Sequence, residues 1–161
     1  MKVAVLMGSD SDWNLMRPAV ETLKSFGIES EVEVASAHRT PAKVRDFVME
    51  APGKGVGAFI VGAGGAAHLA GVVASYTTLP VIGVPISSTS LNGMDSLLST
   101  VQMPSGVPVA TMAINGAKNA ALFAVQVFAV SDKELAKKLV DYRAEMIQGV
   151  DKKAARVKAQ L

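Results

Sequence analysis

The chain has 161 residues, of which 50% are hydrophobic and 19% charged, and its formal net charge is +2. This length and composition suit one globular domain with its own core and exclude an intrinsically disordered chain. The charge is small, the lysines concentrate after position 133, and basic and aromatic residues do not interleave, so we expect no nucleic-acid partner. Cysteine is absent, which excludes disulfides and thiolate chemistry.

The first apolar run, residues 3–7, ends at Gly8 and is followed by the acidic residues Asp10 and Asp12. A secretory signal would need a longer apolar core, so this run predicts a β-strand. Glycine, proline or charge interrupts every later apolar run before it reaches membrane-spanning length. We therefore expect a soluble, cytoplasmic protein with no membrane partner.

Short apolar runs alternate along the chain with longer segments of helical periodicity. The predicted strands are residues 3–7, 32–35, 58–61, 81–85 and 109–114. The predicted helices are residues 12–26, 41–50, 66–75, 94–101, 117–130 and 132 to about 148. Runs that are apolar on both faces are typical of parallel strands covered by helices. The alternation predicts an α/β fold, a single-domain doubly wound parallel five-stranded sheet in the flavodoxin-like order 2-1-3-4-5 with helices on both faces.

The ends of the first two helices carry chemical signals. Ser11 or Asp12 is expected to cap the first helix, and Gly27 to end it. Pro18 falls inside this helix, so either the helix is kinked there or it starts later. Thr40 followed by proline predicts the start of the second helix.

The C-terminal end is expected to lie outside the main domain. We predict a catalytic domain over residues 3–148 and a tail over residues 149–161, which carries four basic residues beside alanine, valine and leucine. The tail is expected to be frayed; the alternative is an arm that packs on another subunit.

In this fold ligands bind at the carboxyl ends of the strands, and the loop after the first strand carries Gly8, Ser9, Ser11 and Asp12. Gly8 lets a ligand approach the backbone, and the two hydroxyls lie beside a helix N-terminus, which suits phosphate. The Asp12 carboxylate repels phosphate but accepts hydrogen bonds from ribose hydroxyls. Serine and aspartate are also ordinary helix caps, so this loop alone leaves both interpretations open.

The loop after the second strand, SAHRTP at 36–41, combines an imidazole with a fixed cation. His38 is one of only two histidines, and imidazole suits proton transfer near neutral pH. Arg39 can form paired hydrogen bonds with a phosphate, and Ser36 is a further candidate for substrate binding. The alternative is a surface turn with an incidental His–Arg pair.

The loop after the third strand, GAGGAAH at 62–68, exposes backbone N–H groups that can cradle an anion or a planar ring. It matches a loose dinucleotide pattern, but it follows the third strand and lacks the acidic residue about twenty positions on. A nicotinamide or flavin dinucleotide is therefore not expected. His68 ends this motif, either as a hydrogen-bonded core or interface histidine or with a direct chemical role. Two histidines without clustered acidic partners predict no metal site.

Two later loops carry weaker signals. The polar loop at 87–93, SSTSLNG, has the composition of a segment that closes over a ligand. Residues 102–108 contain two prolines and are expected to be only a connector.

Taken together, these segments resemble the catalytic-subunit family of phosphoribosylaminoimidazole carboxylases, in the branch of the 5-(carboxyamino)imidazole ribonucleotide mutases. The resemblance covers roughly residues 3–143 and includes the histidine-containing form of the glycine loop. The motifs that carry it are MGSDSDW (7–13), SAHRTP (36–41), GAGGAAHL (62–69), LPVIGVP (79–85), GMDSLLS (93–99), VQMPSGVPV (101–109) and NAAL (119–122). One departure is Ala70, which stands where the family pattern has proline.

The resemblance implies an enzyme without cofactors that moves a carboxylate from the exocyclic nitrogen to ring carbon four of an aminoimidazole ribonucleotide. It implies that His38 transfers the protons and that the neighbouring loops hold the nucleotide. The substrate-binding residues it implies are Ser9, Ser11, Asp12, Ser36, Arg39, Gly64, Gly65 and His68. It further implies a homo-octamer with sites shared between subunits.

Two alternatives stay open beside the mutase. One is a carboxylase that acts directly on 5-aminoimidazole ribonucleotide and carbon dioxide. The other is a non-catalytic nucleotide- or flavin-binding module, which would bind its ligand without turnover.

Overall fold

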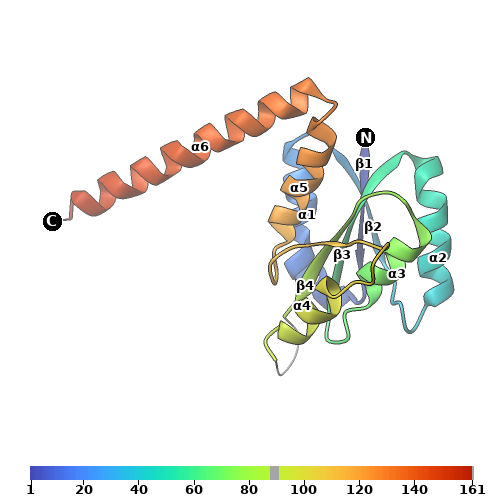
Figure 1. Cartoon of the computed structure of the whole chain (residues 1–161). Coiled ribbons are helices and arrows are strands. Elements are labelled where there is room, and N and C mark those ends of the chain that lie inside the picture. The colour runs from blue at the N-terminus through green and yellow to red at the C-terminus, as the bar shows by residue number, and fades with distance from the viewer. Residues whose placement is uncertain (88–90, 161) are drawn as a thin grey trace. The chain divides into compact units, whose positions relative to one another are not determined.

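A parallel five-stranded sheet in the order β2-β1-β3-β4-β5 forms the centre of the α/β fold (Figure 1). The structure is a computed structural model, and it describes residues 1–87 and 91–160. The predicted fold class and strand order are confirmed. Residues 88–90 of the polar loop predicted to close over a ligand lie outside the described residues.

The elements alternate along the chain as the sequence predicts. The strands are β1 (Lys2–Met7), β2 (Glu29–Val34), β3 (Val56–Gly64), β4 (Val81–Ile86) and β5 (Ala110–Thr111). The helices are α1 (Trp13–Ser25), α2 (Pro41–Glu50), α3 (Leu69–Tyr76), α4 (Met94–Val101), α5 (Ala117–Ala129) and α6 (Lys133–Lys158). Short 3-10 turns, η1 (Asp10–Asp12) and η2 (Ala51–Lys54), precede α1 and follow α2.

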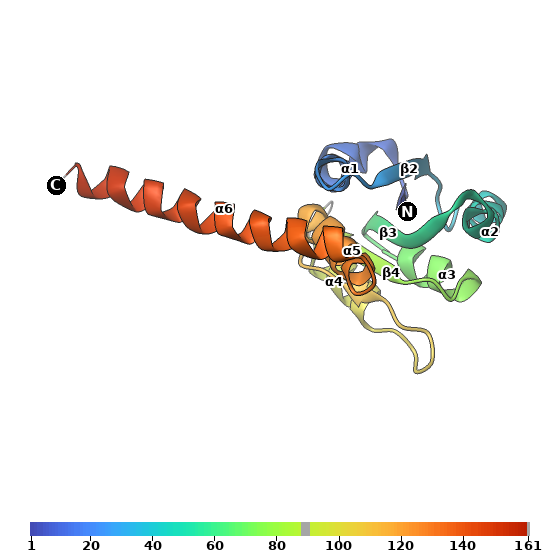
Figure 2. The ribbon, with the colours of Figure 1, turned by 90° about the horizontal axis from the view of Figure 1, so that it is seen from above.

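Helices cover both faces of the sheet, and the central strands are apolar on both faces for that reason. Figure 2 shows α1 on one side of the sheet and α2 and α3 on the other. Phe59 and Val61 of β3 pack in one buried cluster with Val44 and Val48 of α2. On the opposite face, the bare backbone of Gly62 makes room for Met16 of α1, whose sulfur would lie 2.5 Å from a Cβ at that position.

The edge strand β2 differs from the prediction. It begins at Glu29, three residues before the predicted start at residue 32, and its side chains are exposed or half-buried. Val32 and Val34 are 41% and 40% exposed. The charged alternation ESEVEV hides the strand from a search for apolar runs, because an edge strand need not bury both faces.

The strand predicted at 109–114 is reduced to the two residues of β5. Backbone bonds to β4 continue irregularly, from Met112 N–H to the Gly83 carbonyl and from Asn115 N–H to the Pro85 carbonyl. Asn115 has a φ of 60°, which no regular strand accommodates. The segment therefore follows β4 without forming a regular ladder.

The first helix excludes one of the two alternatives for Pro18. The α-helix begins at Trp13 and runs through Pro18 to Ser25, so it does not start later. Gly27 follows it with a φ of 78°, as expected for a glycine that ends a helix.

The last helix extends beyond its predicted end. Instead of ending at about Gln148, α6 continues through Gly149 to Lys158, so the tail is helical rather than frayed. Two compact units, residues 1–124 and 125–161, make up the chain, and the predicted limit between 148 and 149 falls inside α6. One glycine in a 26-residue helix costs about 1 kcal/mol and does not end it. No helix among residues 1–87 and 91–160 is long and apolar enough to cross a membrane.

Gly83 on β4 lies where any side chain would meet its neighbours. A Cβ at this position would lie 2.5 Å from Thr100 Cγ2 and 2.9 Å from Val109 Cγ1. We predict that Gly83→Ala lowers the free energy of unfolding by about 1–3 kcal/mol, because branched side chains in a packed core have little room to move aside. Gly53→Ala is the matched control, since nothing lies within 4 Å of its Cβ. Urea unfolding measures both variants, and equal midpoints would contradict the prediction.

Candidate active site

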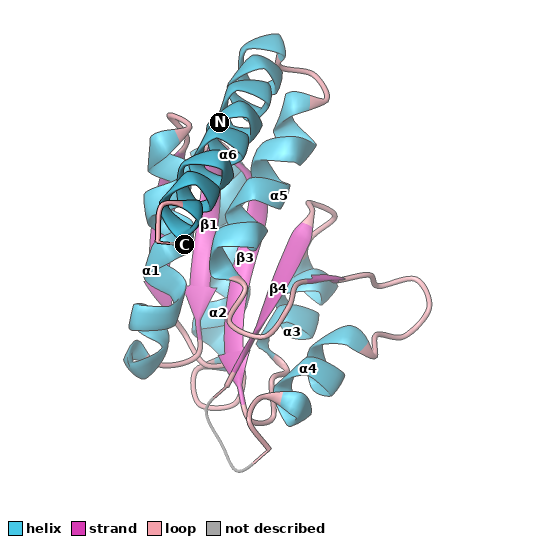
Figure 3. Cartoon of the chain, turned by 90° about the vertical axis from the view of Figure 1, so that its left-hand side faces the viewer, coloured by secondary structure: helices cyan, strands magenta, loops and turns pink. Residues whose placement is uncertain are grey.

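The loops after β1, β2 and β3 meet at one edge of the sheet, because β1 lies between the other two strands. Met7 at the end of β1 pairs with Val34 of β2 on one side and with Gly62 of β3 on the other. Figure 3 shows the arrowheads of β1 and β3 at this edge. Strand order reverses at β1, and this is the position at which doubly wound sheets bind ligands.

A cavity of about 360 Å³ opens between these loops. Such a volume falls in the range of small-molecule sites. Its lining residues are Gly8, Ser9, Ser11, Asp12, Ser36, Ala37, His38, Arg39, Ala63, Gly64, Ala66, His68 and Leu69. Eight of the nine site residues predicted from the sequence are thus brought together.

Gly65 is the predicted site residue that does not line the cavity. Its φ is 58°, and its carbonyl accepts a hydrogen bond of 2.8 Å from the Ala67 N–H. Its freedom to adopt the left-handed conformation shapes the turn that presents Gly64 and His68.

Hydroxyl groups order the loop after β1. Ser9 Oγ accepts the Ser11 N–H and so caps η1. The predicted Asp12 occupies the N-cap position of α1, but its side chain makes no cap hydrogen bond there. The Ser11 hydroxyl lies 2.9 Å from Ser9 Oγ and 3.3 Å from Asp12 Oδ1. Sequence reasoning missed the Ser9 cap because it did not anticipate the 3-10 turn before α1.

Asp12 is the one buried carboxylate of the cavity, with 7% of its surface exposed. Burial raises the pKa of the Asp12 carboxyl, and the hydrogen bond from the Ser11 hydroxyl opposes this rise. A buried carboxylate that lines a cavity is a strong acceptor for a ligand hydroxyl.

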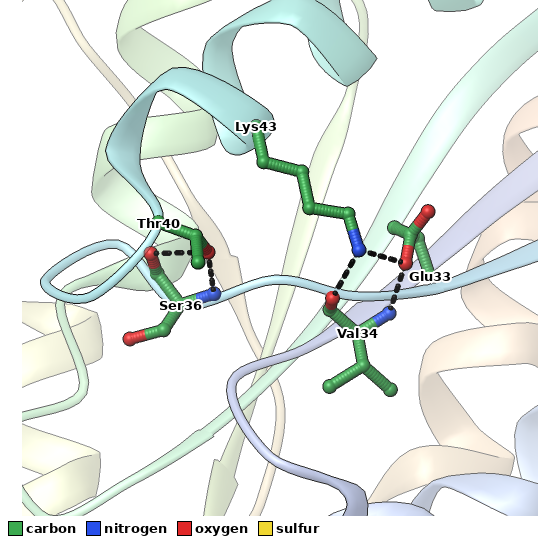
Figure 4. A network of polar contacts seen from close by, with 5 residues as sticks. All are labelled: Glu33, Val34, Ser36, Thr40 and Lys43. Carbon is green, nitrogen blue, oxygen red and sulfur yellow. Dashed lines mark hydrogen bonds and ion pairs between the residues drawn. The ribbon is translucent and has the colours of Figure 1, made fainter.

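Side-chain hydrogen bonds hold the loop after β2 in shape (Figure 4). Thr40 Oγ1 accepts the Ser36 N–H at 2.9 Å and donates to the Ser36 carbonyl at 3.1 Å. Lys43 of α2 joins the two ends of the loop: its Nζ donates to Glu33 Oε1 at 2.7 Å and to the Val34 carbonyl at 2.9 Å. Thr40 therefore closes the loop around His38, although its side chain does not cap α2.

Arg39 links the loops after β1 and β2. Its Nη2 donates to the Gly8 carbonyl at 3.0 Å, and its backbone N–H donates to Ser36 Oγ at 3.2 Å. The guanidinium is thereby held over the serine loop, with further N–H groups available for an anion.

The loop after β3 ends at His68, which occupies the N-cap position of α3. The helix begins at Leu69, three residues later than predicted, because tight turns occupy residues 65–68. His68 is therefore presented at the cavity by the loop instead of being held within a helix.

The two histidines meet across the end of β1. His38 Nε2 lies 2.9 Å from His68 Nδ1. The ring centroids are 5.0 Å apart and the ring planes 78° apart. Sequence reasoning singled out both residues but missed this contact, since they are thirty positions apart. They lie in loops that follow β2 and β3, two strands that are not neighbours in the sheet. Among residues 1–87 and 91–160, no group of three His, Cys, Asp or Glu side chains is placed to hold a metal ion.

The chain is similar in sequence and in structure to proteins of one enzyme family. The model of a family described as AIR carboxylase matches residues 2–149. N5-carboxyaminoimidazole ribonucleotide mutase of Saccharolobus solfataricus is 60% identical over 145 residues, which are 90% of this chain and 92% of that protein. The protein of the same name from Thermotoga maritima is 50% identical over 156 residues, 97% of this chain and 91% of that one. The crystal structure of Treponema denticola PurE has a TM-score of 0.84 at 32% identity and covers 94% of each chain.

Burial of Asp12 predicts a pH-dependent effect of its replacement. The folded state holds the Asp12 proton more tightly than the unfolded state, where the pKa is about 3.9. As pH rises through the window above this value, the unfolded state releases the proton first and the free energy of unfolding falls. We predict that Asp12→Asn is more stable than the wild type near pH 7, and that this advantage shrinks as the pH falls below about 4.

Urea unfolding near pH 7 and below about pH 4 measures the difference in the free energy of unfolding between Asp12→Asn and the wild type. Asp151→Asn removes the same charge from an exposed position on α6 and is the control. An advantage of Asp12→Asn that is equal at both pH values would contradict burial of the charge as its cause.

Proposed function

Because the chain belongs to the AIR carboxylase family, we propose that it is a mutase of purine biosynthesis. It converts 5-carboxyamino-1-(5-phosphoribosyl)imidazole to 5-amino-1-(5-phosphoribosyl)imidazole-4-carboxylate by decarboxylation and recarboxylation. The observation that carries the proposal is the meeting of His38, Arg39 and the serine–aspartate loop in one cavity.

The cavity offers separate places for the parts of a ribonucleotide. Arg39 Nη2 lies 3.0 Å from the Gly8 carbonyl, so its charge is held beside the hydroxyls of Ser9 and Ser11 at the start of η1, an arrangement that suits the phosphate. The buried Asp12 carboxylate accepts hydrogen bonds from the ribose. Ser36 and the backbone at Gly64 face the remaining space, where the imidazole ring is placed.

The reaction needs one group that first gives a proton to the substrate and later takes one back from it. His38 donates a proton to the exocyclic nitrogen while the bond from this nitrogen to the carboxylate carbon breaks and carbon dioxide leaves. Ring carbon four then attacks carbon dioxide, and His38 removes the proton from this carbon, which restores the aromatic ring. A single imidazole can perform both transfers because the net proton count is unchanged.

The cavity walls suit both the release of carbon dioxide from the carbamate and its retention beside the ring. Ala63 and Leu69 are buried side chains that line the cavity together with Ala37. An apolar wall replaces water around the carbamate, whose charge is dispersed as carbon dioxide departs. The same wall keeps the released molecule beside the ring.

The proposal includes a cytoplasmic homo-octamer with shared sites. His38 and His68 are exposed in the single chain, although proton transfer is favoured by exclusion of water. An apolar stripe also lies exposed before and along α4, formed by Leu91, Met94, Leu98 and Val101. Such stripes are typical of interfaces between copies of a chain.

The choice between a mutase and a direct carboxylase is tested with each substrate supplied separately. We predict that purified protein consumes the carboxyamino substrate and forms the 4-carboxylate without added bicarbonate. Consumption of 5-aminoimidazole ribonucleotide with bicarbonate but not of the carboxyamino compound would support the carboxylase instead. Binding without consumption of either would indicate a non-catalytic nucleotide-binding module.

His38 is tested by its replacement with asparagine. We predict that His38→Asn lowers turnover by about 10²–10⁴-fold, because asparagine does not transfer protons near neutral pH. Affinity for 5-aminoimidazole ribonucleotide, measured by calorimetry, is expected to change only a few-fold. Retention of most of the turnover would contradict the proton-transfer role of His38.

A further inference from the structure

The contact between the two imidazoles specifies which nitrogen of His38 does the chemistry. His38 Nε2 lies 2.9 Å from His68 Nδ1, which is a hydrogen-bond distance. The ring planes are 78° apart, so the rings meet at their edges instead of stacking. One proton must therefore lie between these two nitrogens, and His38 Nε2 is occupied by the neighbouring ring.

The direction of this hydrogen bond follows from the reaction. When His38 carries the proton to be transferred, both of its nitrogens bear hydrogen and neither can accept. Its Nε2–H must then donate, and His68 Nδ1 must accept with its hydrogen on Nε2. The opposite direction would break the hydrogen bond each time His38 became protonated.

We propose that His68 is a positioning residue that holds His38 in the Nε2–H tautomer, so that His38 Nδ1 gives and takes the transferred proton. This inference rests on the proposed function. Among residues 1–87 and 91–160, His38 Nδ1 has no hydrogen-bond partner, and the residue lines the cavity. Nδ1 is thus the nitrogen left for the ligand.

The assignment accounts for the whole cycle with one fixed hydrogen bond. Nδ1–H protonates the exocyclic nitrogen, which keeps the electron pair of the broken bond to carbon dioxide. Nδ1 then takes the proton from carbon four, whose former bonding pair returns to the ring. The Nε2–H bond to His68 persists in both states, so the His38 ring need not turn between the two transfers. A partner that orients a base in this way is a general feature of proton-transfer sites.

The tautomer is measured by nitrogen NMR of protein labelled at histidine. The chain has only two histidines, so replacing either one assigns the signals of the other. We expect neutral His38 in the wild type to carry its hydrogen on Nε2. In His68→Phe, which keeps a ring but offers no acceptor, we expect a mixture of tautomers. A His38 hydrogen on Nδ1 in the wild type would overturn the proposal.

Turnover of the carboxyamino substrate provides the second measurement. We predict that His68→Phe lowers kcat by roughly 10–100-fold, the size of effect typical for partners that orient a reacting group, with a KM change of less than about threefold. In His68→Asn the amide oxygen can accept the Nε2–H near the former Nδ1 position, and we expect it to recover at least about tenfold of the loss.

The two measurements separate this inference from the proposed function. Equal kcat losses in His68→Phe and His68→Asn, or a loss confined to KM, would overturn the positioning role while leaving the mutase activity intact. Absence of turnover in the wild type would overturn the proposed function, and the tautomer measured by NMR would still decide how the pair is bonded.

Discussion

The site depends on the parallel pairing of β1 with both β2 and β3. Parallel strands end at the same edge of a sheet, so this pairing brings three loops together that are far apart in the sequence. Burial on both faces holds the two central strands of this pairing: every residue of β1 after Lys2 is buried, and so are seven of the nine residues of β3. A one-residue shift of β1 would reverse which side chains face α1 and which face α2, so the register is strongly specified.

On this frame, a few polar contacts within the chain give the loops their shape. Arg39 joins the loop after β2 to the Gly8 carbonyl, and Thr40 closes its own loop through Ser36. The glycine loop after β3 is shaped by backbone turns instead, with a positive φ at Gly65. Preformed loops reduce the entropy that binding must overcome, so more of the interaction with the nucleotide contributes to affinity and orientation.

The proposed transfer of a carboxylate within one molecule explains why a single titratable group is enough for catalysis. Moving a carboxylate within one molecule needs no net proton, and one imidazole that gives and retakes a proton meets the requirement. In the mechanism that we propose, the transfer depends on the orientation of His38, and the 2.9 Å contact with His68 fixes this orientation. The buried Asp12 carboxylate has a different part, since burial raises its pKa and makes it a better acceptor for ligand hydroxyls than an exposed carboxylate.

The sequence by itself determined the fold class, the central strands and the bounds of α2 and α4, because these follow from local periodicity and helix-starting residues. It also identified the loops of the site, whose glycines, histidines and arginine are unusual in composition. Only the tertiary structure decided that β2 is a half-exposed edge strand, that β5 is two residues long, that α6 passes through Gly149 and that His38 bonds to His68. These features depend on which segments become neighbours in space, and that is a property of long-range packing that no local pattern records.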